Sequence, residues 1–137
     1  MKTMARRHCE ILAAAATLVL GIAALADEGF HFYGPLRRVI TPNAQSNRRA
    51  IFCFNNPADS YASGAIYSLA GSHVVDLGPR QNSAGTGTNC PASAPGSASQ
   101  FLSWDGTADG KVVGSGIYVY QVWAEGRSYT GTVLVTR

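Results

Sequence analysis

The sequence predicts an all-β sandwich or barrel, and three observations lead to this prediction. No segment after residue 26 shows helical periodicity. Short runs rich in Val, Ile, Tyr, Phe and Thr are separated by Gly, Pro, Ser and Asn at intervals of roughly 8–12 residues, which is typical of all-β domains. A chain of 137 residues also has the length of one domain with a single core.

The first 26 residues have the three parts of a cleavable secretory signal. Three positive charges precede an uncharged apolar run from Ile11 to Ala24, and Ala24-Leu25-Ala26 is a small-x-small cleavage site. The apolar run is shorter than the roughly 20 residues of a transmembrane helix, and Cys9 precedes it, which argues against lipid attachment. We therefore expect an exported protein in the periplasm, at the cell surface or in the medium, with no membrane span once the signal is cleaved.

The predicted signal carries much of the positive charge. The whole chain has 11 basic and 8 acidic residues, for a net charge of +3. Cleavage removes three basic residues and one acidic residue, which leaves 8 basic and 7 acidic residues. So small an excess gives no reason to expect a nucleic acid as partner.

Cleavage also leaves two cysteines, Cys53 and Cys90. An even number of cysteines in an exported protein favours a disulfide between them. The bond would close a loop of about 38 residues, which the chain-entropy model values at about 4 kcal/mol. Two isolated cysteines lack the paired spacing of a zinc site.

The mature chain is expected to begin with a tail or edge strand over residues 27–36, followed by the sandwich domain over residues 37–137. Short apolar runs bounded by turn residues indicate the first strands, over Arg37–Ile40 and Arg49–Phe54. Residues 63–69 and 73–77 are two strands joined at Ala70-Gly71-Ser72, a hairpin pattern.

Residues 78–99 contain almost no large apolar side chain. A loop of this length is unusual in a compact domain, so it is expected to be mobile or functional. The next strand is predicted over Gln100–Trp104, followed by a turn at Asp105-Gly106 and a short extended piece at Lys111–Val113.

The clearest hairpin in the sequence joins residues 117–124 to residues 128–136. A two-residue turn at Glu125-Gly126 would place Val122 opposite Tyr129, and Tyr120 opposite Gly131. One face is then apolar and faces the core, while the other is mostly polar and carries Trp123 opposite Ser128. A three-residue turn with a bulge would change these partners.

Several C-terminal motifs occur in a fixed order. They are Trp104-Asp105-Gly106, Asp109-Gly110-Lys111-Val112-Val113, Ser115-Gly116-Ile117-Tyr118-Val119-Tyr120 and the terminal Val133-Leu134-Val135-Thr136-Arg137. In this combination they resemble the immunoglobulin-like domain of the flagellar hook-capping protein family, as found at the C-termini of many secreted bacterial proteins. The resemblance covers residues 39–137. It implies an immunoglobulin or fibronectin type III-like sandwich of about seven antiparallel strands, rather than a flagellar role.

The sequence offers little support for metal binding or catalysis. The residues after Asn43, Ala44-Gln45-Ser46-Asn47-Arg48-Arg49, lack the carboxylates of the similar loop in that family, and the segment from Asp105 ends in Gly116 where a calcium loop requires Glu. His31 and His73 are far apart, and strand alternation predicts that His73 and Asp76 point to opposite faces. No motif for a nucleophile, zinc or phosphate occurs. We therefore expect no catalytic residue, metal or cofactor, and no enzyme.

Aromatic residues provide the candidate contacts. Tyr61, Tyr67 and Tyr129 are expected to serve mostly in the core, whereas Trp123 on the polar face is the candidate partner contact. The basic pairs Arg37-Arg38 and Arg48-Arg49 form no patch on their own if strand alternation separates their side chains.

Together these features predict an exported, non-enzymatic module with a structural, assembly or adhesion role at the cell surface or in extracellular filaments. A protein partner, or self-association through an edge strand, is the expected interaction. The alternative is a soluble binding module for a glycan or peptide.

Overall fold

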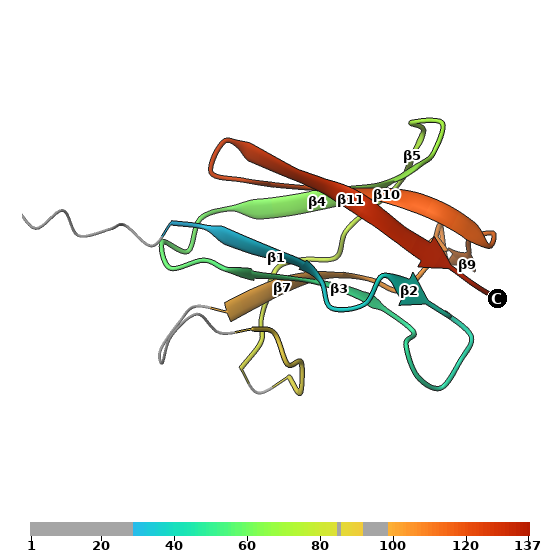
Figure 1. The fold of residues 1–137 in the computed structure, drawn as a ribbon, viewed down its shortest axis with the longest axis horizontal. Helices are drawn as coiled ribbons and strands as arrows, with labels where there is room; N and C mark the ends of the chain where they lie inside the picture. Colours follow the sequence, from blue (N-terminus) through green and yellow to red (C-terminus); the bar gives the residue numbers. More distant parts are fainter. Residues whose placement is uncertain (1–28, 85, 92–98) are drawn as a thin grey trace, which may run out of the picture.

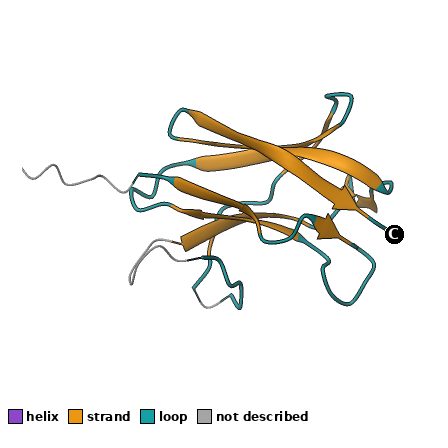
Figure 2. Cartoon of the chain, in the orientation of Figure 1, coloured by secondary structure: helices purple, strands orange, loops and turns teal. Residues whose placement is uncertain are grey.

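The structure, a computed structural model, describes residues 29–84, 86–91 and 99–137. The predicted signal peptide, the next two residues and parts of the expected long loop lie outside these ranges. The described residues form strands and loops without any helix (Figure 2). The strands form two layers of a sandwich rather than a closed barrel, so the all-β sandwich prediction is confirmed (Figure 1).

The first layer is a four-stranded sheet in the order β1-β3-β7-β6. Its strands are β1 (His31–Pro35), β3 (Ala50–Asn55), β7 (Ser99–Trp104) and β6 (Gln81–Asn82). β1 lies at the edge and pairs antiparallel with β3. β6 falls inside the segment that was expected to be a loop. It was not predicted, because two residues are too few to show the alternation of a strand.

The second layer is a five-stranded sheet in the order β2-β11-β10-β4-β5. Its strands are β2 (Val39–Ile40), β11 (Arg127–Val135), β10 (Gly116–Ala124), β4 (Ala62–Ser68) and β5 (His73–Asp76). One pairing departs from the expected antiparallel arrangement, since β2 runs parallel to β11. The chain passes from the first sheet to the second between β1 and β2 (Figure 1). It therefore arrives beside β11 running in the same direction as that strand.

The strand orders are those of an immunoglobulin-like sandwich. The order β1-β3-β7-β6 corresponds to strands A, B, E and D, and β4-β10-β11 corresponds to C, F and G, with β5 added beside C. A small ribbon of β8 (Thr107–Ala108) and β9 (Lys111–Val112) lies in the connection before β10. The structure exceeds the expected seven strands because it includes four strands of only two residues, β2, β6, β8 and β9.

The core lies between the inner faces of the two sheets. β3 and β7 contribute the buried side chains of Phe52, Phe54, Leu102 and Trp104, and the second sheet contributes those of Ile40, Ile66, Tyr120, Val122, Val133 and Val135. These residues alternate along the longer strands with outward-facing ones, so each sheet presents one face to the core.

The hairpin of β10 and β11 has the predicted register. Val122 pairs with Tyr129, Tyr120 with Gly131, and Trp123 with Ser128. The turn residues Glu125 and Gly126 have φ angles of 50° and 70°. Two positive φ angles characterise the type I′ turn, whose twist matches that of the flanking strands, so the two-residue turn is confirmed and the bulged alternative is wrong.

Gly131 makes room for the ring of Tyr120, its partner on the neighbouring strand. A Cβ atom on Gly131 would lie 2.6 Å from Cζ and 2.8 Å from Cε1 of Tyr120, and closer still to its hydroxyl oxygen. The tyrosine is only 6% exposed. Burial raises the pKa of Tyr120 above its ordinary value, an effect that the positive charge of Arg38 partly opposes.

Replacing Gly131 by Ala is therefore expected to lower the free energy of unfolding by about 1–3 kcal/mol, because the buried ring must shift to accommodate the methyl group. Urea unfolding followed by circular dichroism would measure the change. Gly114→Ala is the matched control, since its nearest contact would be 3.9 Å from the Tyr118 hydroxyl oxygen. Equal stability of the two variants would contradict this account of Gly131.

Candidate functional site

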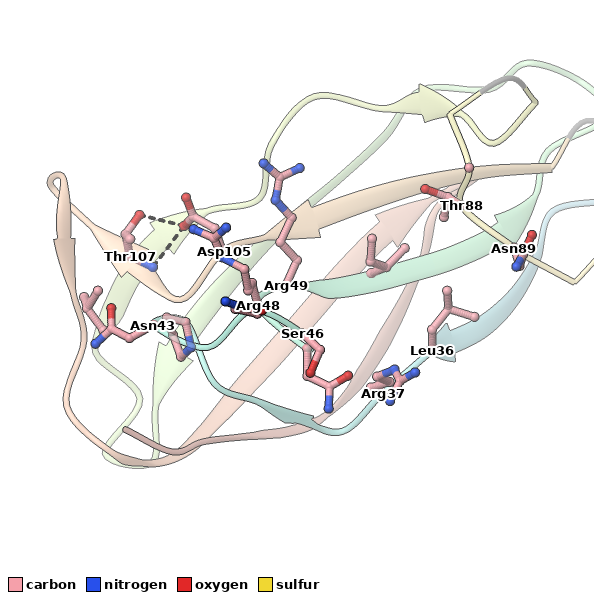
Figure 3. Close-up of a pocket in the computed structure, with 16 residues that line it drawn as sticks. Leu36, Arg37, Asn43, Ser46, Arg48, Arg49, Thr88, Asn89, Asp105 and Thr107 are labelled. Carbon is pink, nitrogen blue, oxygen red and sulfur yellow. Dashed lines mark hydrogen bonds between the residues drawn. The ribbon is translucent and has the colours of Figure 1, made fainter.

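An open groove of about 1100 Å³ lies along one end of the four-stranded sheet (Figure 3). Its lining comes from residues 36–37 between β1 and β2, residues 42–43 and 45–49 between β2 and β3, and residues 87–89 of the loop before β7. Ile51, Asp105, Thr107 and Val112 complete it. We call it the arginine groove, because Arg37, Arg48 and Arg49 line it.

The loop between β2 and β3 forms one side of the arginine groove and is closed by its own hydrogen bonds. The Thr41 amide donates to the carbonyl oxygen of Asn47 over 2.8 Å, and the Ala44 amide donates to the carbonyl oxygen of Thr41 over 3.0 Å. Asn47 has a φ of 59°, a left-handed conformation that asparagine tolerates better than most residues. The backbone that leads into Arg48 and Arg49 is thereby held in place.

The Asp105 turn forms the end of the groove. Oδ1 of Asp105 accepts hydrogen bonds from the amide of Thr107 over 3.0 Å and from its hydroxyl over 2.6 Å. Gly106 has a φ of 78°, and a Cβ atom there would collide with the ring of Pro42. The turn thus packs directly against the loop between β2 and β3, and its carboxylate is engaged within the turn.

The predicted disulfide between Cys53 and Cys90 is confirmed, with 5.5 Å between the two Cα atoms. Cys53 lies between the core residues Phe52 and Phe54 on β3, so its side chain points to the outer face of the sheet. Its neighbour across the sheet is Phe101, and both are buried. The bond therefore fastens residues 86–91 over this outer face and supports the wall of the groove next to Cys90.

Three arginines line the groove although the sequence suggested no basic patch. Alternation along a strand does not apply to them, because Arg37 lies between β1 and β2, and Arg48 and Arg49 precede β3. Arg37 is positioned by the hydrogen bond from the Leu36 amide to the carbonyl oxygen of Ile51, 2.8 Å long. The closure of the two loops, which no local pattern reveals, brings these side chains to one surface.

A second surface lies on the outer face of the five-stranded sheet. Leu134 on β11 pairs with Val39 on β2 and with Ile117 on β10. These side chains are exposed by 38%, 47% and 49%, respectively. We call these three residues the apolar row.

Trp123 lies on the same outer face, at the other end of β10. It is half-buried between its cross-strand neighbours Ser63 and Ser128. The other aromatic candidates do not join it. Tyr129 packs against the core beside Phe32, Tyr67 contacts His73 edge to face, and Tyr61 is 83% exposed beyond the sheet.

The expectation that His73 and Asp76 point to opposite faces is wrong. Nε2 of His73 lies 2.9 Å from Oδ1 of Asp76. Tyr67 pairs with His73 while its neighbour Ile66 pairs with Val75, so β5 contains one extra residue, a bulge that reverses the alternation. Both side chains are exposed, at 52% and 83%, as in a surface ion pair.

The described ranges contain no group of three or more His, Cys, Asp or Glu residues that could hold a metal ion. In the same part of the chain, no helix has the length and apolar character that crossing a bilayer requires. Comparison with protein-family models, curated proteins and solved structures finds no match for this chain.

Proposed function

We propose that the protein is an exported, non-enzymatic immunoglobulin-like module with a structural, assembly or adhesion role at the bacterial cell surface or in extracellular filaments. The disulfide is compatible with an oxidising location. A sandwich of two sheets is also the general architecture that the resemblance to the hook-capping domain implies. In the described residues the two histidines lie on different sheets, His31 on β1 and His73 on β5, which supports a role without catalysis.

The apolar row is the observation that carries the assembly role. Outward-facing residues of a solvated sheet are normally polar, as Ser128, Thr130 and Thr132 are along the first part of β11. The last part of the same strand instead aligns Leu134 with Val39 and Ile117. Exposed apolar side chains that adjoin across three strands mark a site of association.

The sheet edges are less suited to self-association. β2 and β6 have only two residues, β1 contains a bulge and ends in Pro35, and β5 contains a bulge and ends in Asp76. Short strands, bulges, proline and charge all hinder pairing between edges. The proposed contact is therefore on the sheet face rather than at the edge.

Sedimentation velocity of the mature protein over a wide concentration range tests this role. The wild type is expected to form dimers or larger species, and Leu134→Lys is expected to weaken association at least about tenfold by placing a charge in the contact. Thr130→Lys, at an exposed outward position on the same strand, is the matched control and should behave as the wild type. A wild type that stays monomeric at the highest concentration would count against assembly.

The second candidate function is that of a soluble binding module for a glycan or peptide. The arginine groove favours it, because an open concave surface lined by polar side chains is a usual form of binding site. Trp123, being half-buried, offers a smaller contact surface than the groove.

A further inference from the structure

The arginine groove carries a net positive charge, because three arginines and a single carboxylate, that of Asp105, are among the residues that line it. Among the described residues, the ion pairs are those of His73 with Asp76 and of Arg80 with Asp59. Neither involves an arginine of the groove. The carboxylate that lines the groove, Asp105, already accepts two hydrogen bonds from Thr107. The guanidinium groups of Arg37, Arg48 and Arg49 are exposed and open to an external anion.

The groove is also held in shape before any ligand binds. The disulfide at Cys90 fixes the wall that contains Thr88 and Asn89, and the contact of Gly106 with Pro42 fixes the opposite end (Figure 3). Fixed walls reduce the entropy lost on binding, and the planar guanidinium group loses less per hydrogen bond than a lysine would. These features distinguish the groove from a merely basic loop.

The lining indicates the chemical class of the ligand. Guanidinium groups bind carboxylates through paired hydrogen bonds. Between the arginines lie amides and hydroxyls, among them Asn43, Ser46 and Thr88, which can donate to and accept from the hydroxyls of a sugar. The described lining contains no aromatic ring on which a neutral sugar could stack.

An acidic peptide matches these features less well than an acidic glycan. Peptides are commonly held by an exposed strand edge, an apolar helix groove or an aromatic-lined channel. The arginine groove is lined mainly by loops, and its apolar part is limited to Leu36, Pro42, Ile51 and Val112. Its volume of about 1100 Å³ exceeds that of most small-molecule pockets and is suited to several units of a chain.

We infer that the arginine groove binds a polysaccharide that carries carboxylate groups, with Arg37, Arg48 and Arg49 contacting the carboxylates. This inference rests on the second candidate function and is independent of the apolar row. The ligand is defined by its chemistry, a flexible chain of hydroxyl-rich units with repeated negative charge. Binding should weaken as salt concentration rises, since the contacts are exposed and ionic.

Isothermal titration calorimetry of the mature protein with hexagalacturonate, maltohexaose and hexaglutamate tests the inference. Hexagalacturonate is expected to bind. The triple variant R37Q/R48Q/R49Q should weaken binding about 100-fold, and the variant with three lysines about tenfold, because charge without the paired hydrogen bonds is insufficient. Arg127→Gln removes one positive charge by the same substitution at the far end of β11 and should leave binding unchanged.

Each contrary result has a distinct meaning. Equal or tighter binding of maltohexaose or hexaglutamate would overturn the ligand class while leaving the binding function in place. If none of the three oligomers binds, both the ligand class and the binding function are wrong. If the triple variant binds as the wild type does while Trp123→Ala does not bind, the site lies on the outer face of the other sheet and the inference is wrong. Circular dichroism of each variant establishes that the fold is intact.

Discussion

Replacing both Cys53 and Cys90 by alanine is expected to lower the free energy of unfolding by about 4 kcal/mol. The bond closes a long loop, since the two residues are separated by 37 positions, and opening it increases the conformational freedom of the unfolded chain. In the folded state it ties Cys90 to Cys53, whose cross-strand neighbour Phe101 is only 4% exposed. Urea unfolding of the chain without its predicted signal, compared with the double variant of the same chain, measures the loss.

A reductant provides the control for the disulfide. Reduction should destabilise the wild type to about the same extent as the double substitution and should leave the double variant unchanged. Loss of the bond should also weaken hexagalacturonate binding, because residues 87–89 would no longer be fastened to β3. A stability loss below about 1 kcal/mol would indicate that the chain-entropy model does not describe this loop.

Replacing Trp104 by alanine is expected to cost about 4 kcal/mol of stability, within the usual range for a buried aromatic residue. The indole is 3% exposed at the end of β7 and packs edge to face with Tyr118, with 5.4 Å between ring centroids. Its Nε1 donates a hydrogen bond to the carbonyl oxygen of Thr107 over 2.9 Å. The side chain thus links the core to the turn that ends the arginine groove.

Trp104→Phe separates the contribution of core packing from that of the indole hydrogen bond. The phenyl ring keeps much of the packing but leaves the Thr107 carbonyl without its indole donor, so a loss of about 1–2 kcal/mol is expected. Unfolding should be followed by circular dichroism rather than by tryptophan fluorescence, because both substitutions remove a tryptophan. Equal losses for alanine and phenylalanine would contradict the assignment of most of the effect to packing.

The parts of the fold that local pattern could predict are those with sufficient length or a specific turn. The hairpin of β10 and β11 combines nine-residue strands with a Glu125-Gly126 turn, and its register was predictable pair by pair. The disulfide followed from the count of cysteines after the predicted signal. The bulge at β5 was not predictable, because an extra residue on one strand is defined only by the pairing with the other.

The arginine groove was beyond the reach of sequence patterns for a different reason. Arg37 is separated from Arg48 by a crossing between the two sheets and a closed loop, and Thr88 comes from a segment fixed by the disulfide. None of these neighbours is related by a helical or strand period. Only the tertiary fold shows that their side chains line the same surface.

The parallel pairing of β2 with β11 has a mechanical consequence. The start of β1 and the end of the chain lie at opposite ends of the sandwich (Figure 1). Tension between these ends pulls β2 and β11 past one another. Two hydrogen bonds join these strands: the Leu134 amide donates to the Arg38 carbonyl oxygen over 2.7 Å, and the Thr136 amide donates to the Ile40 carbonyl oxygen over 2.9 Å. Under tension both bonds are loaded in shear at the same time, instead of opening one after another. The disulfide lies outside this path, so stretching would leave the wall of the arginine groove in place.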